Sequence, residues 1–208
     1  SGQGCGNQCQ FRRGDSGHGF GPGHAARRIG GKMMSETIVN EYLGMTLQID
    51  HLDHANQTYF QHCTNHQFHL QKCDDCGLIR YPVSEGCSWC GSSRANWTEV
   101  EGKGTVHSYT EIHHAIQPAF KSHVPYMVLL VDLDTQNGQP TEHEALRIIG
   151  NLVIPDGTLA PPEMVASVGI GSRVRMVFTA VGDGISLPQW PPDEGADQSE
   201  PPWRYPAE

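Results

Sequence analysis

The sequence lacks any run of apolar residues long enough to cross a bilayer, and it is poor in positive charge. Lys and Arg number 14 against 23 Asp and Glu, which gives a formal net charge of −9 at pH 7. Proteins that bind nucleic acid place clustered Lys and Arg against phosphates. The composition therefore predicts a cytoplasmic protein without a membrane span and argues against nucleic-acid binding.

The motifs of common hydrolases are also missing. The sequence has no Gly-x-Ser-x-Gly elbow, and neither a Ser-His-Asp order nor an open, histidine-rich metal site can be assembled from it. His113 and His114 are the best candidates for a catalytic base, and the alternative for both is an exposed strand or loop position. Cys63 has no Cys-His-acid signature around it, so we expect a buried thiol rather than a nucleophile.

Residues 1–32 differ in composition from the rest of the chain. They hold ten glycines, five Lys or Arg and one acid, without apolar periodicity, which predicts disorder. No apolar segment follows their basic residues, so they are not a signal peptide. Translation starting at Met33 or Met34 is one hypothesis, with the leader coming from a mis-set start or an added expression segment. Cys5 and Cys9 would then be incidental, with a Cys-x3-Cys metal contact as the alternative.

Without this leader the charge argument becomes stronger. Residues 33–208 hold 9 Lys or Arg against 22 Asp or Glu, a net charge of −13. Such a surface repels a polyanion, so we expect no salt-sensitive binding to single-stranded DNA or RNA.

Four cysteines in two Cys-x2-Cys pairs are the strongest motif in the chain. Each pair is followed by a glycine that permits a tight turn, so that all four sulfurs can point at one ion about 2.3 Å away. Two disulfides are the alternative, but such close pairs bridge poorly and nothing indicates secretion. The sequence therefore predicts one structural zinc ion per chain, held by Cys73, Cys76, Cys87 and Cys90.

Elements on either side complete a ribbon domain. Leu52, Ala55, Tyr59, Phe60 and Cys63 follow helical spacing, which predicts an amphipathic helix that sends His54, Gln61 and His62 toward solvent. The histidines between 51 and 69 are read as solvated or capping residues, with a second metal site as the alternative. A strand over 68–72 enters the first cysteine pair, and a second strand over 78–83 leaves it.

A β-rich unit follows over residues 101–190. Strands are predicted at 97–110, with glycines at a bend, and at 126–133, 147–154, 173–181 and 185–187, separated by turn signals. The strand 126–133 is continuously apolar and is expected to be buried on both faces. Five short strands with one irregular connection at 161–168 favour a small OB-type barrel.

The fold prediction is thus mostly β: a leader (1–32), an N-terminal helix with a rubredoxin-like zinc ribbon (33–100), a five-stranded OB-type barrel (101–190) and a tail (191–208). The tail is acidic and rich in proline, and it is too poor in aliphatic residues to fold alone. The acidic, proline-rich stretch begins at Pro188, and aromatic residues on it are expected to be buried by a partner, which makes Trp190, Trp203 and Tyr205 predicted partner contacts.

These motifs together resemble a known family. The resemblance covers roughly residues 50–190 and rests on the order of the helix, a leucine-bearing strand and the following motifs: Cys73-x2-Cys76-Gly77, Tyr81-Pro82, Cys87-x2-Cys90-Gly91, Trp97, Gly102-x-Gly104-Thr105-Val106-x-Ser108-x-Thr110, Pro118-x-Phe120, Pro125-Tyr126 and Gly171-x-x-Val174. This order is similar to the zinc-ribbon and OB-fold proteins called domain of unknown function 35. The histidine-rich helix, the long loop from Asp134 to Glu144 and the aromatic tail depart from the pattern.

The resemblance implies a non-catalytic accessory subunit that binds acyl-CoA together with a thiolase-fold enzyme in a hetero-oligomer. Members of this family bind one of three kinds of partner. These are acetoacetyl-CoA thiolase together with hydroxymethylglutaryl-CoA synthase, acylphloroglucinol-forming enzymes, and steroid side-chain aldolases. Two alternatives remain: a nucleic-acid-binding OB protein, in which Tyr109 and Tyr126 would stack on bases, and an independent acyl-CoA enzyme.

CoA joins phosphates to a narrow apolar arm, so a binding face needs cations beside aromatic rings. Lys121 lies in the loop that resembles the family motif, beside Phe120 and Tyr126. Arg173 and Arg175 alternate on one predicted strand face, about 7 Å apart. These five residues are the predicted acyl-CoA contacts, with strand-surface and barrel-packing roles as their alternatives.

Overall fold

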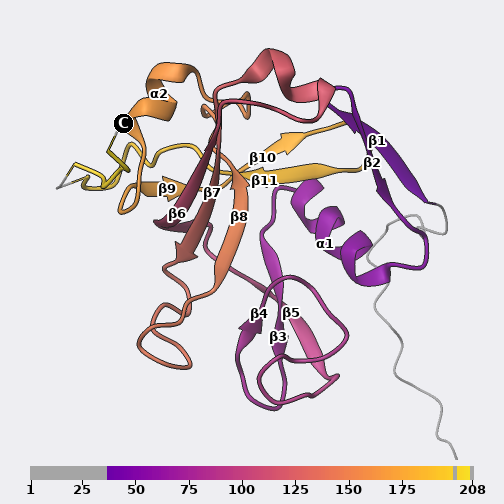
Figure 1. The fold of residues 1–208 in the computed structure, drawn as a ribbon. Helices are drawn as coiled ribbons and strands as arrows, with labels where there is room; N and C mark the ends of the chain where they lie inside the picture. Colours follow the sequence, from indigo (N-terminus) through magenta and orange to yellow (C-terminus); the bar gives the residue numbers. More distant parts are fainter. Residues whose placement is uncertain (1–36, 199–200, 207–208) are drawn as a thin grey trace, which may run out of the picture. The chain divides into compact units, whose positions relative to one another are not determined.

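The computed structural model describes residues 37–198 and 201–206 (Figure 1). The expected disordered leader and its Cys5 and Cys9 lie outside these residues. The described chain is mostly β, as expected, with one helix of three turns, one short helix and one 3-10 turn. Among these residues, no helix combines the length and the apolar character needed to cross a membrane.

A β-hairpin that the sequence analysis missed precedes the predicted helix. Strands β1 (Ile38–Tyr42) and β2 (Met45–Ile49) pair antiparallel through a two-residue turn. Helix α1 (His54–Thr64) then begins after Asp53, whose carboxylate accepts a hydrogen bond from the Asn56 N–H at 3.1 Å. The helix is thus confirmed, but it starts later than the apolar spacing suggested.

The faces of α1 follow the expected pattern in part. Tyr59 and Cys63 are buried and Gln61 is exposed, as predicted. Leu52 is the exception: it precedes the helix and is 72% exposed, so its assignment to the buried face was wrong. His62 is half-buried because its ring stacks on His69, with 4.3 Å between the centroids.

The ribbon is a three-stranded antiparallel sheet in the order β4-β3-β5. Its strands are β3 (His69–Cys73), β4 (Ile79–Arg80) and β5 (Ala95–Glu99). The fifth strand of the chain therefore belongs to the ribbon, although the sequence analysis joined its residues to the following barrel strand. Figure 1 shows this sheet below α1.

The barrel is built around a four-stranded antiparallel sheet in the order β8-β7-β6-β9. Its strands are β6 (Lys103–Ile112), β7 (Tyr126–Leu133), β8 (Arg147–Asn151) and β9 (Arg173–Arg175), and the 3-10 turn η1 (Pro118–His123) joins β6 to β7. A bulge at His107 shifts the register of β6 against β7. The remaining strands, β10 (Val177–Ala180) and β11 (Ser186–Gln189), form a hairpin.

Three details of the barrel differ from the prediction. Strand β7 alternates buried and half-buried side chains, so only one of its faces lies fully in the core. The expected strand 173–181 breaks at Met176 into β9 and β10, which belong to different sheets. The connection at 161–168 contains a short helix, α2 (Pro162–Ser167).

One apolar core joins the ribbon to the barrel. It contains Leu70 and Ile79 from the ribbon, Tyr59 and Cys63 from α1, and the buried face of β7. A second cluster packs the β1–β2 hairpin, through Tyr42 and Ile49, against η1 and the start of β11. The hairpin thus covers the end of the barrel at which β6 and β7 are joined.

The C-terminal residues fold back on the barrel. Residues 191–193 extend along β9, because the Asp193 N–H donates to the Arg173 carbonyl at 3.0 Å and the Arg175 N–H donates to the Pro191 carbonyl at 3.1 Å. Trp203 pairs with Ile170 in an isolated antiparallel bridge. The expectation that this segment cannot fold considered only its apolar content. Backbone hydrogen bonds hold much of it against the barrel. The domain boundaries at 32, 100 and 190 stay predictions.

Candidate functional site

The four predicted zinc ligands converge on one point. The sulfur atoms of Cys73, Cys76, Cys87 and Cys90 all lie within 4.8 Å of one another, and the two shortest sulfur pairs are 3.5 and 3.6 Å apart. A tetrahedral zinc with bonds of about 2.3 Å needs sulfurs about 3.8 Å apart. The thiols are free rather than joined as disulfides. The set therefore fits a closed tetrahedral site with no position left for water.

The two cysteine pairs are built alike. The Gly77 N–H donates to the Cys73 carbonyl at 3.0 Å, and the Gly91 N–H donates to the Cys87 carbonyl at 2.9 Å. Both glycines have positive φ, 76° and 75°, which explains the glycine after each pair. The main chain thus turns each pair of sulfurs toward the same ion.

Backbone N–H groups also favour the charged form of two thiols. The N–H of Cys76 points at the Cys73 sulfur and lowers its pKa. Burial raises the pKa of the Cys87 thiol, but the N–H groups of Cys90 and Trp89 together with the thiols of Cys76 and Cys90 lower it to about 6. Thiolates bind zinc, so these contacts prepare the site for the metal.

A buried arginine holds the two cysteine turns at a fixed separation. Arg80 donates from Nε to Gln71 Oε1 at 3.0 Å and from Nη2 to the Ser84 carbonyl at 2.8 Å, and Nη1 lies 3.4 Å from the Ser92 carbonyl. Gln71 Oε1 also accepts from the Ser84 N–H at 3.0 Å. The sequence analysis missed this role, because an arginine in a two-residue strand gives no periodic signal.

The long loop after β7 docks on the ribbon. Gln136 Oε1 accepts from the Ile79 N–H at 2.6 Å, and its Nε2 donates to the Ile79 carbonyl at 2.9 Å. The amide side chain therefore imitates a neighbouring strand on the edge of β4. This is a structural use of the loop from Asp134 to Glu144, whose length departed from the family pattern.

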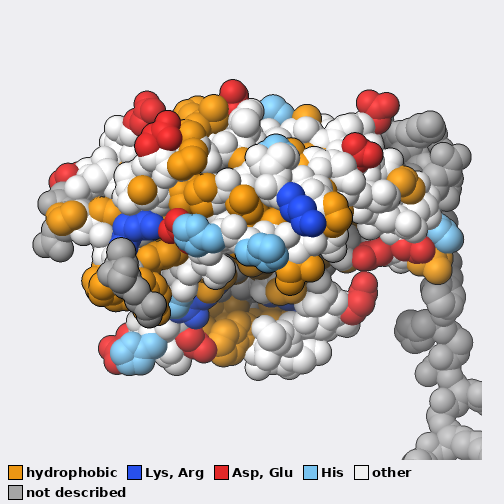
Figure 2. Space-filling view, turned by 45° about the horizontal axis from the view of Figure 1, so that its top comes forward, with side chains coloured by type: hydrophobic (Ala, Val, Ile, Leu, Met, Phe, Trp, Pro, Cys, Tyr) orange, Lys and Arg blue, Asp and Glu red, His pale blue; other side chains and the backbone are white. Residues whose placement is uncertain are grey.

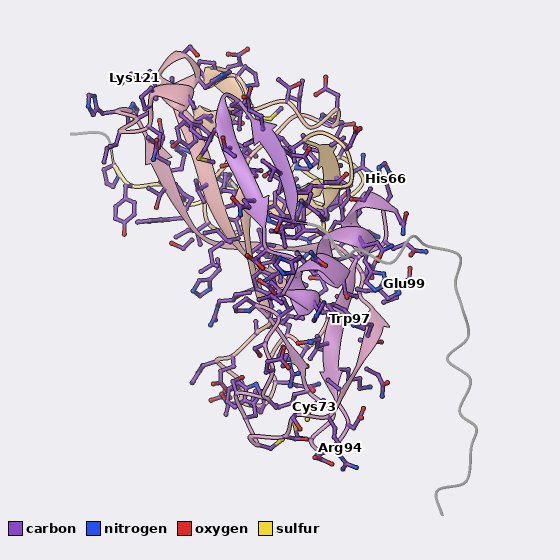
Figure 3. The ribbon with its side chains drawn as sticks, turned by 90° about the vertical axis from the view of Figure 1, so that its right-hand side faces the viewer. His66, Cys73, Arg94, Trp97, Glu99 and Lys121 are labelled. Carbon is purple, nitrogen blue, oxygen red and sulfur yellow. The ribbon has the colours of Figure 1, made fainter. Side chains whose placement is uncertain are left out.

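The five predicted acyl-CoA contacts do not form one site. Ile112 pairs with Tyr126, and Lys103 pairs with Arg175, so the two groups border opposite ends of β6. Nine residues of strand separate these ends, about 30 Å at 3.3 Å per residue. The structure thus places Phe120, Lys121 and Tyr126 in one region and Arg173 and Arg175 in another. Figure 3 shows Lys121 and Cys73 at opposite ends of the view.

Several of the five residues are occupied by packing. Phe120 is only 9% exposed, and its ring contacts those of Tyr42 and Tyr126, with centroids 6.1 and 5.2 Å away. Arg173 forms a two-pronged ion pair with Asp134 at 2.7 and 2.5 Å and also donates to the Thr105 hydroxyl at 2.8 Å. Lys121 and Arg175 are exposed.

Arg175 lines a groove that the sequence analysis missed. The groove has a volume of about 310 Å³ and lies where the ribbon meets the start of β6. It brings two rings, Phe68 and Phe178, together with His66, Lys103 and Arg175, and the acids Glu99 and Glu101 line it as well. His66 stacks on Phe178, with 5.6 Å between the centroids. Only the tertiary structure brings these residues together, since they come from three separate segments.

The three predicted partner contacts also fall into two groups, one buried and one exposed. Trp190 is completely buried and belongs to the main core, so its expected contact with a partner was wrong. The physical reason is that residues 188–193 continue the sheet rather than leaving it. Trp203 and Tyr205 are 51% and 72% exposed, and a partner contact at these two residues stays a prediction.

The face of the described residues drawn in Figure 2 shows no basic strip. On the face drawn in Figure 2, Lys and Arg side chains are few and lie apart from one another, among acidic and histidine side chains. Of the two tyrosines considered for base stacking, Tyr109 is covered in part by the Arg204 guanidinium, 5.2 Å from the ring centroid. Tyr126 packs on Phe120.

Comparison with known proteins agrees with the geometry. Residues 97–179 match the family model of the C-terminal OB-fold domain of ChsH2. A solved structure titled "Ltp2-ChsH2(DUF35) aldolase" is 28% identical, with a TM-score of 0.53, and the match covers 67% of this chain and 95% of that one. A DUF35 protein of unknown function from Sulfolobus solfataricus is 16% identical over 68% of this chain and 87% of its own, with a TM-score of 0.42.

One curated relative has a name that refers to CoA chemistry. The "probable enoyl-CoA hydratase alpha subunit" of Thermomonospora curvata is 28% identical over 148 residues, which are 71% of this chain. The chain spans 40% of that relative's length. The two named similarities are thus to subunits of an aldolase and of a hydratase.

Proposed function

Residues 97–179 form an OB-fold domain of the ChsH2 type, and from this premise we propose that the chain is a non-catalytic accessory subunit of a thiolase-fold enzyme, with which it holds acyl-CoA. The observation that supports this most is the match with the structure titled "Ltp2-ChsH2(DUF35) aldolase", which covers 67% of this chain and 95% of the matched chain. A cytoplasmic hetero-oligomer follows from the proposal.

The chemistry of the cysteines supports a structural rather than a catalytic role. Four of the described cysteines form the closed metal site. The fifth, Cys63, is fully buried, and this burial raises the pKa of its thiol to about 12, so the reactive thiolate is disfavoured. We assign one structural zinc ion per chain to the four-cysteine site.

For acyl-CoA we propose the groove at Arg175 as the primary contact on this subunit. Its volume of about 310 Å³ is at the lower end of ligand pockets, enough for one portion of CoA while the partner covers the rest. Arg175, Lys103 and His66 can contact phosphate, and two phenylalanine rings offer apolar surface. Lys121 is the competing contact, at the other end of β6.

Co-expression with a candidate thiolase-fold partner enzyme tests the function. We expect a complex of fixed stoichiometry that cleaves or condenses acyl-CoA, with neither protein active by itself. Full activity of the partner alone, or the absence of a complex, would contradict the accessory role. Turnover by this chain alone would instead indicate an independent enzyme.

Two charge reversals then decide between the proposed contacts. If the Arg175 groove holds CoA, Arg175→Glu should raise the acyl-CoA KM of the complex about tenfold, because a phosphate contact is replaced by repulsion. Lys121→Glu is the matched variant, with the same change of charge about 30 Å away. A larger KM effect at Lys121 would move the site to the η1 end.

A further inference from the structure

Two histidine rings join the end of α1 to the ribbon. His62 lies in the last turn of the helix, and His69 is the first residue of β3. Their imidazole rings are stacked, with 4.3 Å between the centroids and 17° between the planes. The ring of Trp97 on β5 also contacts His62, with 5.3 Å between the centroids. The histidine-rich stretch that departs from the family pattern therefore places a pair of imidazoles where α1 meets the ribbon sheet.

A short turn after the helix brings the two rings together. The His66 N–H donates to the Cys63 carbonyl at 2.9 Å, and the Gln67 N–H donates to the His62 carbonyl at 3.0 Å. His66 has a positive φ of 56°, so the chain reverses at this residue. His69 therefore lies beside His62 although it follows seven positions later in the sequence.

The stacked pair differs from other histidines of the chain in having no acid beside it. Four histidine nitrogens lie 3.0 to 3.3 Å from a carboxylate oxygen: His51 with Asp50, His107 with Asp132, His113 with Glu111 and His143 with Glu142. Within the part of the chain that the structure describes, neither His62 nor His69 has such a partner. A fall in pH therefore adds ion pairs at the four sites, whereas at the stacked pair it adds charge without an ion-pair partner.

Burial adds to the cost of this charge. His69 Nδ1 is buried and has no hydrogen-bond partner among the described residues. The neutral ring can keep its single proton on Nε2, but the charged ring must also carry one on Nδ1, a buried N–H without an acceptor. Burial of His62 is the main reason that its pKa lies below the ordinary value of 6.5, and the charge of His69 is the second. Both effects act against the end of α1, whose main-chain dipole favours a cation.

Among the described residues around the pair, the other titratable groups are Glu99 on β5 and His66 just after α1. Glu99 is the strand partner of His69, so its one carboxylate can compensate a charge there but leaves a second charge on His62 unpaired. Strands β10 and β11 also pack on α1 and carry no titratable side chain. Glu99 and His66 both line the groove at Arg175, and Figure 3 shows Trp97 and Glu99 between Cys73 and His66. The end of α1 thus leads directly into the wall of that groove.

We propose that the stacked rings of His62 and His69 are a pH-sensitive lock between α1 and the ribbon. With both rings neutral, stacking holds the end of the helix on β3. As the pH falls below the ordinary histidine value of about 6.5, protons on both rings place two like charges about 4.3 Å apart, and their repulsion separates the rings. The end of α1 and the turn that carries His66 are then released. The inference concerns the free chain and stands apart from the proposed function.

Urea unfolding between about pH 7.5 and 5.5 tests the lock in the zinc-loaded chain. Because the folded chain keeps His62 neutral to a lower pH than the unfolded chain does, the contribution of the pair is complete above 6.5 and is lost as the pH falls through 6.5. His62→Phe keeps a ring against His69 without the charge, so it should lose less stability than the parent over this range. His54→Phe is the matched control, the same change at the exposed start of the same helix, and should follow the parent.

Hydrogen exchange locates the effect in the chain. In the parent, the protection factors of the His66 and Gln67 amides should fall about three- to tenfold over the same pH range, because these amides close the end of α1. In His62→Phe they should change less, and the amides of β7 serve as the internal reference. Zinc content is measured at each pH, since protonated thiols release the metal. One zinc ion per chain at about pH 7.5 will show that both variants fold.

An NMR titration of the imidazole protons in the parent chain needs no variant to fold. The ring of His62 should titrate below 6.5, and titration at or above this value would overturn the lock. Parallel loss of stability in the parent and in His62→Phe would overturn it as well. Unchanged protection at the end of α1 would show that the rings stay stacked when charged, which also contradicts the inference. None of these outcomes bears on whether the chain binds a thiolase-fold partner.

Discussion

The ribbon and the barrel are stabilised by different interactions. Between residues 73 and 94 the buried side chains are Cys73, Ile79, Arg80 and Cys87, three of which carry polar or metal-binding atoms. Strand β7 alone buries four apolar side chains completely: Met127, Leu129, Val131 and Leu133. The ribbon therefore relies on its four-cysteine cluster and on directed hydrogen bonds, whereas the barrel depends on apolar area removed from water.

The largest expected effect comes from removing a metal ligand. Cys76→Ala should abolish tight zinc binding and expose residues 73–94 to protease, because structural zinc contributes about 10–16 kcal/mol of apparent binding energy in small domains. Elemental analysis and limited proteolysis measure the two effects. Cys63→Ala is the control and should keep one zinc ion per chain. A zinc-free protein with a protease-resistant ribbon would contradict this account.

A cavity in the barrel should act on the other region. Leu129→Ala should lower the free energy of unfolding by about 2–5 kcal/mol, since the side chain is completely buried. The folded variant should still hold one zinc ion. Ile149→Ala on the exposed part of β8 should change stability by less than about 0.5 kcal/mol. Loss of zinc from folded Leu129→Ala protein would show that the two regions are not separable.

The contact between the loop after β7 and the ribbon is expected to contribute less to stability than the barrel core. Gln136→Ala removes both hydrogen bonds to Ile79, and at about 0.5–1.5 kcal/mol each the loss should be about 1–3 kcal/mol. Faster exchange of the Ile79 amide would locate the effect at the edge of β4. Asn137→Ala, at an exposed neighbouring position, should leave that amide unchanged. Equal exchange of the Ile79 amide in the two variants would show that Gln136 does not hold the loop on the ribbon.

The smallest effect is a dependence on pH within the barrel. Hydrogen bonds from Arg173 lower the pKa of Asp134 below its ordinary value of 3.8. The ion pair therefore stabilises the fold above the ordinary pKa, and its contribution is lost as the pH falls through the lowered one. Solvent limits this contribution to about 1 kcal/mol or less. In urea titrations, Asp134→Asn should be less stable than the parent at pH 6, and the difference should shrink as the pH falls below 3.8.

The metal site shows what local sequence can predict. A Cys-x2-Cys-Gly segment carries its own turn, because glycine permits the positive φ that aims both sulfurs at one ion. Strand β7 and helix α1 were also visible, since their apolar residues are closely spaced along the chain. Each of these predictions depends on neighbours within a few residues.

The ligand and partner residues show where this reasoning ends. Arg173 and Arg175 were correctly placed two residues apart in one strand, yet one is bound to Asp134 and the other borders a groove with His66 and Lys103. Trp190 was taken for part of an exposed tail and lies in the core. These outcomes depend on contacts between residues far apart in the sequence, such as Arg173 with Asp134 and Arg175 with His66, which no local spacing reveals.

The sequence by itself thus determined the four-cysteine cluster, the mostly β content and the acidic character, because these follow from residue types and short-range geometry. The tertiary structure decided which strands pair and where the C-terminal segment docks. The physical reason is that strand pairing joins distant residues through main-chain groups that every residue carries. Side-chain pattern can favour a strand, but only the folded chain selects its neighbour.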